Sequence, residues 1–125
     1  GSASHVAYAL RGESVLLGPG EDGRLGVLSA WPPDDSLPPR DMAAALWSWE
    51  RGEPAGRGTD TLPTARQTFV PVRSGETTLA VLGAARGEEG LAPTDLALLA
   101  LLADQVGLAL ARERLARELE GARVA

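Results

Sequence analysis

Hydrophobic and polar positions divide the chain into short apolar runs broken by glycine and proline, with one long apolar segment at the end. Runs at Ser14–Leu17 and Leu25–Trp31 flank a turn and predict a β-hairpin with a longer loop. Runs at Gln67–Val72 and Thr77–Ala85, joined by a short turn, predict a second hairpin. Pro71 cannot donate a hydrogen bond to a sheet ladder, so it predicts that its strand is an edge or bulged strand.

Helices are predicted between and after the two hairpins. The first covers about Arg40–Arg51, with Gly52 as its stop. The second covers about Pro93–Glu120 and is expected to end at Gly121. At Val6–Leu10 two alternatives stay open, an early strand or the last turn of an N-terminal helix. The order strand-strand-helix-strand-strand-helix predicts an α+β fold, with an antiparallel sheet sandwiched by helices.

The terminal helix has two apolar faces. One follows the 3-4 spacing of a stripe that packs on a sheet, and consists of Leu99, Leu102, Val106 and Leu110. The other repeats every seven residues and consists of Leu98, Leu101, Gln105, Leu108, Arg112, Leu115 and Leu119. This second set has the spacing of the a and d seam of a short coiled coil, with two polar interruptions. Because one face serves the domain's own core, the other predicts a partner, and we expect a homodimer.

The composition of this helix changes abruptly after Ala111. Arg112–Glu120 reads R-E-R-L-A-R-E-L-E, which is too polar for a core. We therefore expect a domain over residues 1–111 and the start of a helical linker over 112–125. The alternative is an ordinary C-terminal helix that frays after Ala111.

Charge and composition exclude several classes of partner and site. The net charge is −5 and no basic cluster is present, which argues against nucleic acid and anionic membranes. The absence of cysteine excludes disulfides, thiolate nucleophiles and cysteine-based metal sites. The longest unbroken apolar run, Leu96–Ala103, has eight residues. A membrane span needs about twenty, so we expect no direct membrane insertion.

No constellation of catalytic or metal-binding residues is evident. His5 is the only histidine, and no Ser-His-Asp set, P-loop or paired-histidine motif accompanies it. The acidic residues Asp22, Asp34–Asp35 and Glu88–Glu89 sit in predicted turns, where solvated side chains are expected and cation binding is the alternative. We therefore predict no catalytic residue, no metal site and no enzymatic activity for this chain.

One segment, Trp47–Pro63, has a pattern specific enough to indicate a family. It reads W-S-W-E-R-G-E-P-A-G-R-G-T-D-T-L-P. It resembles the GAF domain of the KdpD family, the potassium-responsive sensor histidine kinases of bacterial two-component systems. The matching positions are Trp47, Trp49, Gly52, Pro54, Ala55, Gly56, Gly58, Thr59, Asp60, Thr61, Leu62 and Pro63, with a weaker match at Pro71–Glu76.

The resemblance implies a fold, a role and a location. The fold is of the GAF and PAS type, usually opened by a helix that would here be truncated. The role is regulatory, in a kinase (a transferase) that controls potassium-uptake genes. The domain would lie on the cytoplasmic side of an inner-membrane protein and contact other domains of the same kinase. Its linker would lead toward the dimerisation helix that bears the phospho-accepting histidine.

The same segment is the best candidate for a ligand site. Its glycines let backbone amides converge into an anion-binding nest, and Arg57 and two hydroxyls add donors. The candidate residues are Trp49, Gly56, Arg57, Gly58, Thr59, Asp60 and Thr61. The alternative is that Thr59 or Asp60 hydrogen-bonds its own turn and holds the loop against the sheet. For the helix before the loop, we expect Trp47 to pack on the sheet with Ala43 and Leu46, or both tryptophans to fill the core.

Two functions follow from these patterns. In the first, the domain relays signals through its terminal helix and has no ligand. In the second, it is a sensor of a small molecule or ion, with a pocket between the sheet and the 52–63 loop. Other GAF domains hold cyclic nucleotides, haem or bilins on this side of the sheet. A thioether-linked bilin needs a cysteine, and the lone His5 argues against haem, so we expect no cofactor.

Overall fold

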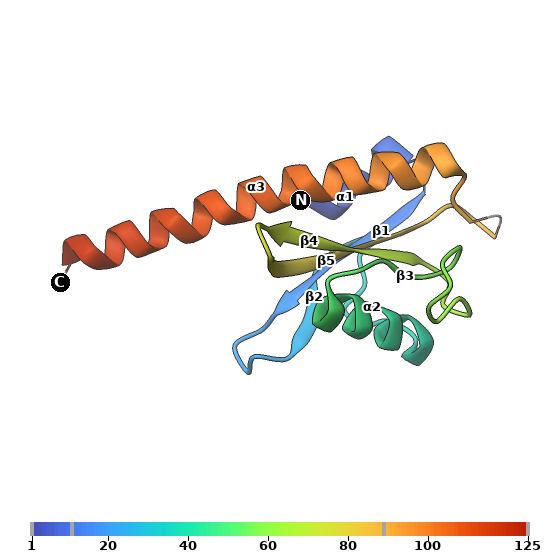
Figure 1. Ribbon diagram of the computed structural model, residues 1–125, viewed down its shortest axis with the longest axis horizontal. Helices are drawn as coiled ribbons and strands as arrows, with labels where there is room; N and C mark the ends of the chain where they lie inside the picture. Colours follow the sequence, from blue (N-terminus) through green and yellow to red (C-terminus); the bar gives the residue numbers. More distant parts are fainter. Residues whose placement is uncertain (1, 11, 89, 125) are drawn as a thin grey trace.

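The computed structural model describes residues 2–10, 12–88 and 90–124. Its five strands form one antiparallel sheet in the order β2-β1-β5-β4-β3 (Figure 1). The elements along the chain are α1 (Ser2–Leu10), β1 (Glu13–Pro19), β2 (Leu25–Trp31), α2 (Pro39–Arg51), β3 (Ala55–Gly56), β4 (Thr68–Ser74), β5 (Thr77–Ala85) and α3 (Pro93–Val124). The expected α+β class is confirmed.

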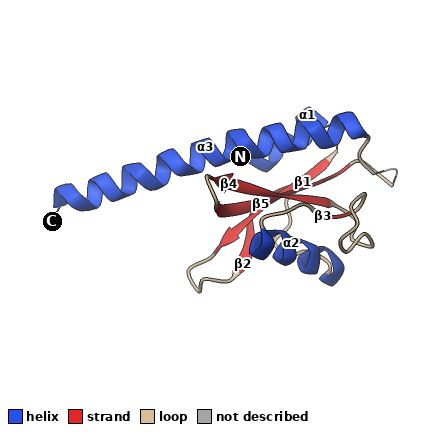
Figure 2. Cartoon of the chain, viewed as in Figure 1, coloured by secondary structure: helices blue, strands red, loops and turns tan. Residues whose placement is uncertain are grey.

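Helices cover both faces of the sheet. Figure 2 shows α1 and α3 on one face and α2 on the other. Alternate strand residues point to opposite faces, so the sheet divides the interior into two cores. Leu16, Leu82 and Leu99 belong to the core under α1 and α3, whereas Phe69 and Val81 belong to the core under α2.

Both predicted hairpins are present, and Pro71 lies in a strand with a bulge, as predicted. The edge strand β3 pairs with β4 only at Thr68 and Phe69. At Pro71 the outer side of β4 is therefore unpaired, and a register shift follows between Val72 and Arg73. Sequence patterning missed β3 because two residues are too short to show an alternation.

The structure defines two helical segments that the sequence left uncertain, the end of α1 and the end of α3. Val6–Leu10 is helical and forms the end of α1, which decides between the two alternatives. The expected end of α3 at Gly121 is wrong, because the helix continues to Val124. Glycine in a helix costs only about 1 kcal/mol relative to alanine, and no proline follows to prevent continuation. At the end of α2, by contrast, Gly52 has φ 68° and donates its N–H to the Ser48 carbonyl at 2.8 Å.

The face that α2 presents to the sheet differs from the expected one. Ala44, Ala45 and Ser48 are buried, whereas Leu46 is 42% exposed. Trp47 and Trp49 are both partly buried and flank the core under α2. The predicted grouping of Trp47 with Ala43 and Leu46 is wrong, because those two residues are exposed. Trp47 itself packs against the core, and so does Trp49, which is nearer to the alternative that both tryptophans fill the core. Small side chains occupy the central contact because they let the helix approach the sheet closely.

Candidate functional site

The terminal helix α3 lies close against the sheet at Gly107. A Cβ atom at this position would lie 2.6 Å from the carbonyl oxygen of Arg73 in β4, a distance that a real methyl group cannot occupy. Past this crossing, Ala111 is half-buried and residues 112–121 are exposed. Figure 1 shows the same half of the helix extending beyond the sheet. The first half of α3 thus belongs to the domain and the second half leaves it.

A stripe of exposed leucines runs along α3 from Leu101 to Leu119. We call this set the leucine stripe; its members and exposed fractions are Leu101 at 55%, Leu108 at 62%, Leu115 at 58% and Leu119 at 57%. At 100° per residue the four lie within about 40° of one line along the helix, roughly opposite the buried face that includes Leu99. Gln105 and Arg112 are exposed beside the stripe. Leu98, the remaining member of the predicted seam, is half-buried and packs against the core instead.

The start of α3 is tied to neighbouring segments by polar contacts. Asp95 accepts a hydrogen bond from the Ala92 N–H at 3.0 Å and forms an ion pair with Arg86 at 3.2 Å. Arg57, from the loop after α2, donates from Nη2 to the carbonyl oxygen of Glu88. The segment that enters α3 is therefore fixed both to the end of β5 and to the 52–63 loop.

The 52–63 loop is closed by hydrogen bonds within its own turn. The Thr59 hydroxyl lies 2.8 Å from the Gly56 carbonyl and 2.9 Å from the Thr61 carbonyl, and accepts the Thr61 N–H at 3.1 Å. The Gly56 N–H donates to the Thr61 carbonyl at 2.8 Å, and the Arg57 N–H to the Gln67 carbonyl at 3.1 Å. The geometry favours the alternative in which Thr59 holds the loop, because an anion would have to compete for these amides. A ligand site at the seven predicted residues stays a prediction.

Asp41 anchors the segment between this loop and β4, a role that the sequence patterns did not indicate. Its side chain is buried in the first turn of α2. One carboxylate oxygen accepts the Arg66 N–H at 3.1 Å, and the other accepts the Gln67 N–H at 3.0 Å. The signal was ambiguous, because an acidic residue in a first helical turn is also favourable when it is fully exposed.

The acidic turn residues mostly bond to their own turns. Asp22 accepts the Arg24 N–H at 3.0 Å, and Asp34 accepts the Ser36 N–H at 3.2 Å. Within residues 2–10, 12–88 and 90–124, no group of three acidic, histidine or cysteine residues is placed to hold a metal ion. Glu89 and the side chain of His5 lie outside the described part of the structure.

One helix of the described chain, α3 over Pro93–Gly121, is long and apolar enough to cross a membrane by length and composition alone. The search for an unbroken apolar run missed this, because Asp95 and Asp104 interrupt the run without making the helix polar. Leu99, Leu102 and Ala103 of this helix are buried in the core. Core helices of soluble proteins have the same property, so the absence of membrane insertion stays a prediction.

Comparison with known proteins shows the family to which the chain belongs. A family model described as GAF domain matches residues 1–112. The sensor protein KdpD of Escherichia coli (strain K12) is 38% identical over 77 residues, which cover 62% of this chain and 8% of that protein. The sensor protein KdpD of Clostridium acetobutylicum is 32% identical over 84 residues, covering 67% of this chain and 9% of that protein. The chain thus spans less than a tenth of either relative.

Solved structures give the same result. The native GAF domain of the potassium sensor histidine kinase KdpD from Escherichia coli has a TM-score of 0.76 and 33% identity, covering 94% of this chain and 82% of that one. A methyl-accepting chemotaxis protein fragment has a TM-score of 0.71 at 14% identity, covering 91% of this chain and 87% of that one, which shows the fold alone.

Proposed function

We propose that this chain, which belongs to the GAF domain family, is a regulatory domain of a sensor kinase similar to KdpD. It relays signals as a dimer, through α3. The observation that carries the proposal is the leucine stripe, which lies opposite the face that α3 packs on the sheet. A helix with two apolar faces in one domain has one face free for a partner.

The polar surroundings of the stripe support a helix pair. Four leucines that are each more than half exposed stabilise a structure only when a partner removes them from water. Gln105 and Arg112 interrupt the apolar seam, as polar residues do where they define the register of a coiled coil. The ion pair of Arg114 with Glu118, 3.9 Å apart, is largely exposed and contributes little by itself. The projecting half of α3 therefore depends on a second copy for most of its stability.

The contacts at the start of α3 provide a route for the relay. A movement of the 52–63 loop acts on the segment before α3 through the bond from Arg57 to Glu88. A rigid helix then carries that displacement to its far end. A ligand or neighbouring domain can shift the helix only if it binds two arrangements with different affinity.

The remaining parts of the proposal concern the full-length kinase. We propose that it phosphorylates a response regulator of potassium-uptake genes, and that this domain lies on the cytoplasmic side of an inner-membrane protein. Its partners would be a second copy of the chain and other domains of the kinase. The described residues bring no catalytic constellation together, so the GAF domain would contribute no chemistry of its own.

Replacement of one stripe residue tests the dimer. We expect Leu108→Arg to shift sedimentation from dimer to monomer, because a charge would replace a leucine in the middle of the apolar seam. Circular dichroism should change little, since Leu108 is 62% exposed in the single chain. Ala100→Arg is the matched control, because Ala100 is an exposed α3 residue that lies off the stripe. An unchanged sedimentation coefficient for Leu108→Arg would exclude this seam.

The second candidate, a sensor with a ligand between the sheet and the 52–63 loop, has weaker support because the loop uses its own amides. Melting temperatures measured with potassium and sodium salts, phosphate, and cyclic and linear nucleotides separate the two functions. A ligand of the native state raises the melting temperature by mass action. The relay function predicts the same melting temperature with every compound. A specific, saturating rise in melting temperature with one of them would favour the sensor.

A further inference from the structure

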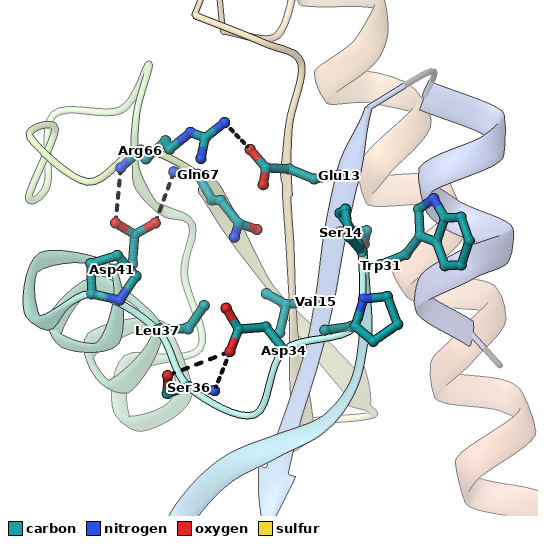
Figure 3. A pocket seen from close by; sticks show the side chains of 14 residues that line it. Glu13, Ser14, Val15, Trp31, Asp34, Ser36, Leu37, Asp41, Arg66 and Gln67 are labelled. Carbon is teal, nitrogen blue, oxygen red and sulfur yellow. Dashed lines mark hydrogen bonds and ion pairs between the residues drawn. The ribbon is translucent and has the colours of Figure 1, made fainter.

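A cavity of about 260 Å³ lies on the α2 face of the sheet, apart from the 52–63 loop. It is enclosed by the start of β1, the end of β2, the connection to α2 and the residues just before β4 (Figure 3). Val15, Ala30 and Leu37 supply an apolar lining. Figure 3 shows that the Trp31 indole points away from the cavity, so the cavity is not an aromatic cage.

Gln67 lines this cavity and has an unused hydrogen-bonding group. The residue is only 8% exposed, and its Oε1 is buried with no hydrogen-bond partner. Its backbone is fixed by the bond from its N–H to Asp41. A buried carboxamide oxygen without a donor is uncommon in native proteins. The terminal torsion of glutamine is broad and roughly two-fold, so a half-turn brings the oxygen to the cavity side.

Asp34 contributes a second acceptor at the mouth of the cavity. Its Oδ1 accepts from the Ser36 N–H at 3.2 Å and from the Ser36 hydroxyl at 3.5 Å. The other carboxylate oxygen is not engaged in these bonds, and Figure 3 shows it on the cavity side, facing Gln67. After the half-turn of the Gln67 amide, two acceptors line the same space, from two segments that are distant in sequence.

The charges around the cavity favour a cation. Its lining includes the carboxylates of Glu13, Asp34 and Asp41 and one guanidinium, that of Arg66. Arg66 Nη2 lies 2.6 Å from Glu13 Oε1, so the positive group is already paired. Asp41 uses both oxygens on backbone amides. Asp34 and Asp41 therefore have no cationic partner in the lining, and of the two only Asp34 has an oxygen outside these hydrogen bonds.

We propose that this cavity binds a small organic amine in its protonated form. The ammonium group donates to the free oxygen of Asp34 and to Oε1 of Gln67, and the carbon chain packs on Val15 and Leu37. A divalent metal fits poorly, because calcium and magnesium take six or more oxygen ligands and the wall beside these two acceptors is apolar. The site lies on the opposite face of the sheet from α3, so it does not depend on dimerisation.

Titration of the isotope-labelled chain with ethanolamine tests the site. We expect saturable amide shifts at Ser14, Ser36 and Gln67, all of which line the cavity. Tetramethylammonium has the same charge but no N–H donor, and acetamide has N–H donors but no charge. Neither should saturate in the millimolar range where ethanolamine does. Equal binding of either compound, or no saturation by ethanolamine, would overturn the proposal.

Two neighbouring aspartates provide a matched pair of variants. Asp34→Asn should weaken ethanolamine binding about tenfold or more, because a charge-assisted hydrogen bond is lost. Asp35→Asn should leave the affinity unchanged, since Asp35 is exposed and does not line the cavity. Asp34 is exposed as well, so neither change should affect folding. If both variants lose affinity equally, the binding reflects surface charge only and the site is wrong.

Discussion

At the scale of single residues, the 52–63 loop depends on two glycines for different reasons. Gly56 has φ 96°, and a Cβ on it would lie 2.4 Å from the Gln67 carbonyl oxygen and 3.2 Å from the Phe69 ring. Gly58 has φ 81°, but a Cβ there would have nothing within 4 Å. Both backbones are strained for other residues, whereas only Gly56 also lacks space.

This difference predicts unequal effects of the same substitution. Gly58→Ala should cost about 1 kcal/mol of unfolding free energy, from the left-handed backbone alone. Gly56→Ala should cost about 3 kcal/mol, because the clash with Gln67 adds to the backbone term. Urea denaturation of the two variants measures both values. Equal losses would show that the loop relaxes freely around position 56.

The candidate ligand residues could be predicted only in part. The motif at Trp47–Pro63 located the loop, because glycine and proline at fixed spacing restrict the backbone in a recognisable way. It also suggested, as one of two alternatives, that Thr59 or Asp60 would bond the loop's own turn, and the geometry favours this for Thr59. Asp34 was singled out only as an acidic turn residue with cation binding as the alternative, and Gln67 carried no signal. Their proximity could not be predicted, since it depends on how distant segments meet on the folded sheet.

At the scale of elements, α3 contains two glycines with different surroundings. Gly107 lies at the crossing with β4, where a Cβ would be 2.6 Å from the Arg73 carbonyl oxygen. Gly121 lies in the exposed half of the helix, and a Cβ there would have nothing within 4 Å. Periodicity predicted the helix and its apolar faces, but it could not say that the helix continues past Gly121 or that Gly107 permits a close contact.

The two positions should therefore respond to alanine with opposite signs. Gly121→Ala should raise stability or helicity slightly, by up to about 1 kcal/mol, because alanine is the better helix former. Gly107→Ala should lower stability by about 1–3 kcal/mol, because the methyl group separates α3 from β4. Thermal unfolding followed by circular dichroism tests both. A stabilising Gly107→Ala would show that the crossing is not tight.

The same limits explain which elements were predicted. The hairpins were found because alternation in a strand is a local property of the sequence. The rotation of α2 was not, because Ala44 and Ala45 face the sheet through their small size rather than their hydrophobicity. The strand β3 was missed because it exists only as a partner for Thr68 and Phe69.

At the scale of the whole molecule, the two faces of the sheet have separate roles in the proposed account. The α2 face holds the loop, its anchor Asp41 and the cavity beside Gln67. The other face carries α1 and α3, and α3 leads away from the domain with its leucine stripe exposed. Arg57 joins the two by bonding the loop to the segment that enters α3. A change on one face can thereby bias a dimer formed on the other.

The central claim is that two copies of α3 meet along the leucine stripe, and disulfide cross-linking tests it most directly. The chain contains no cysteine, so each introduced cysteine is the only one present. Oxidation should give cross-linked dimers for Leu108→Cys and Leu115→Cys, and little product for Ala100→Cys, which lies off the stripe. Equal cross-linking at all three positions, or none at the two stripe positions, would contradict the account.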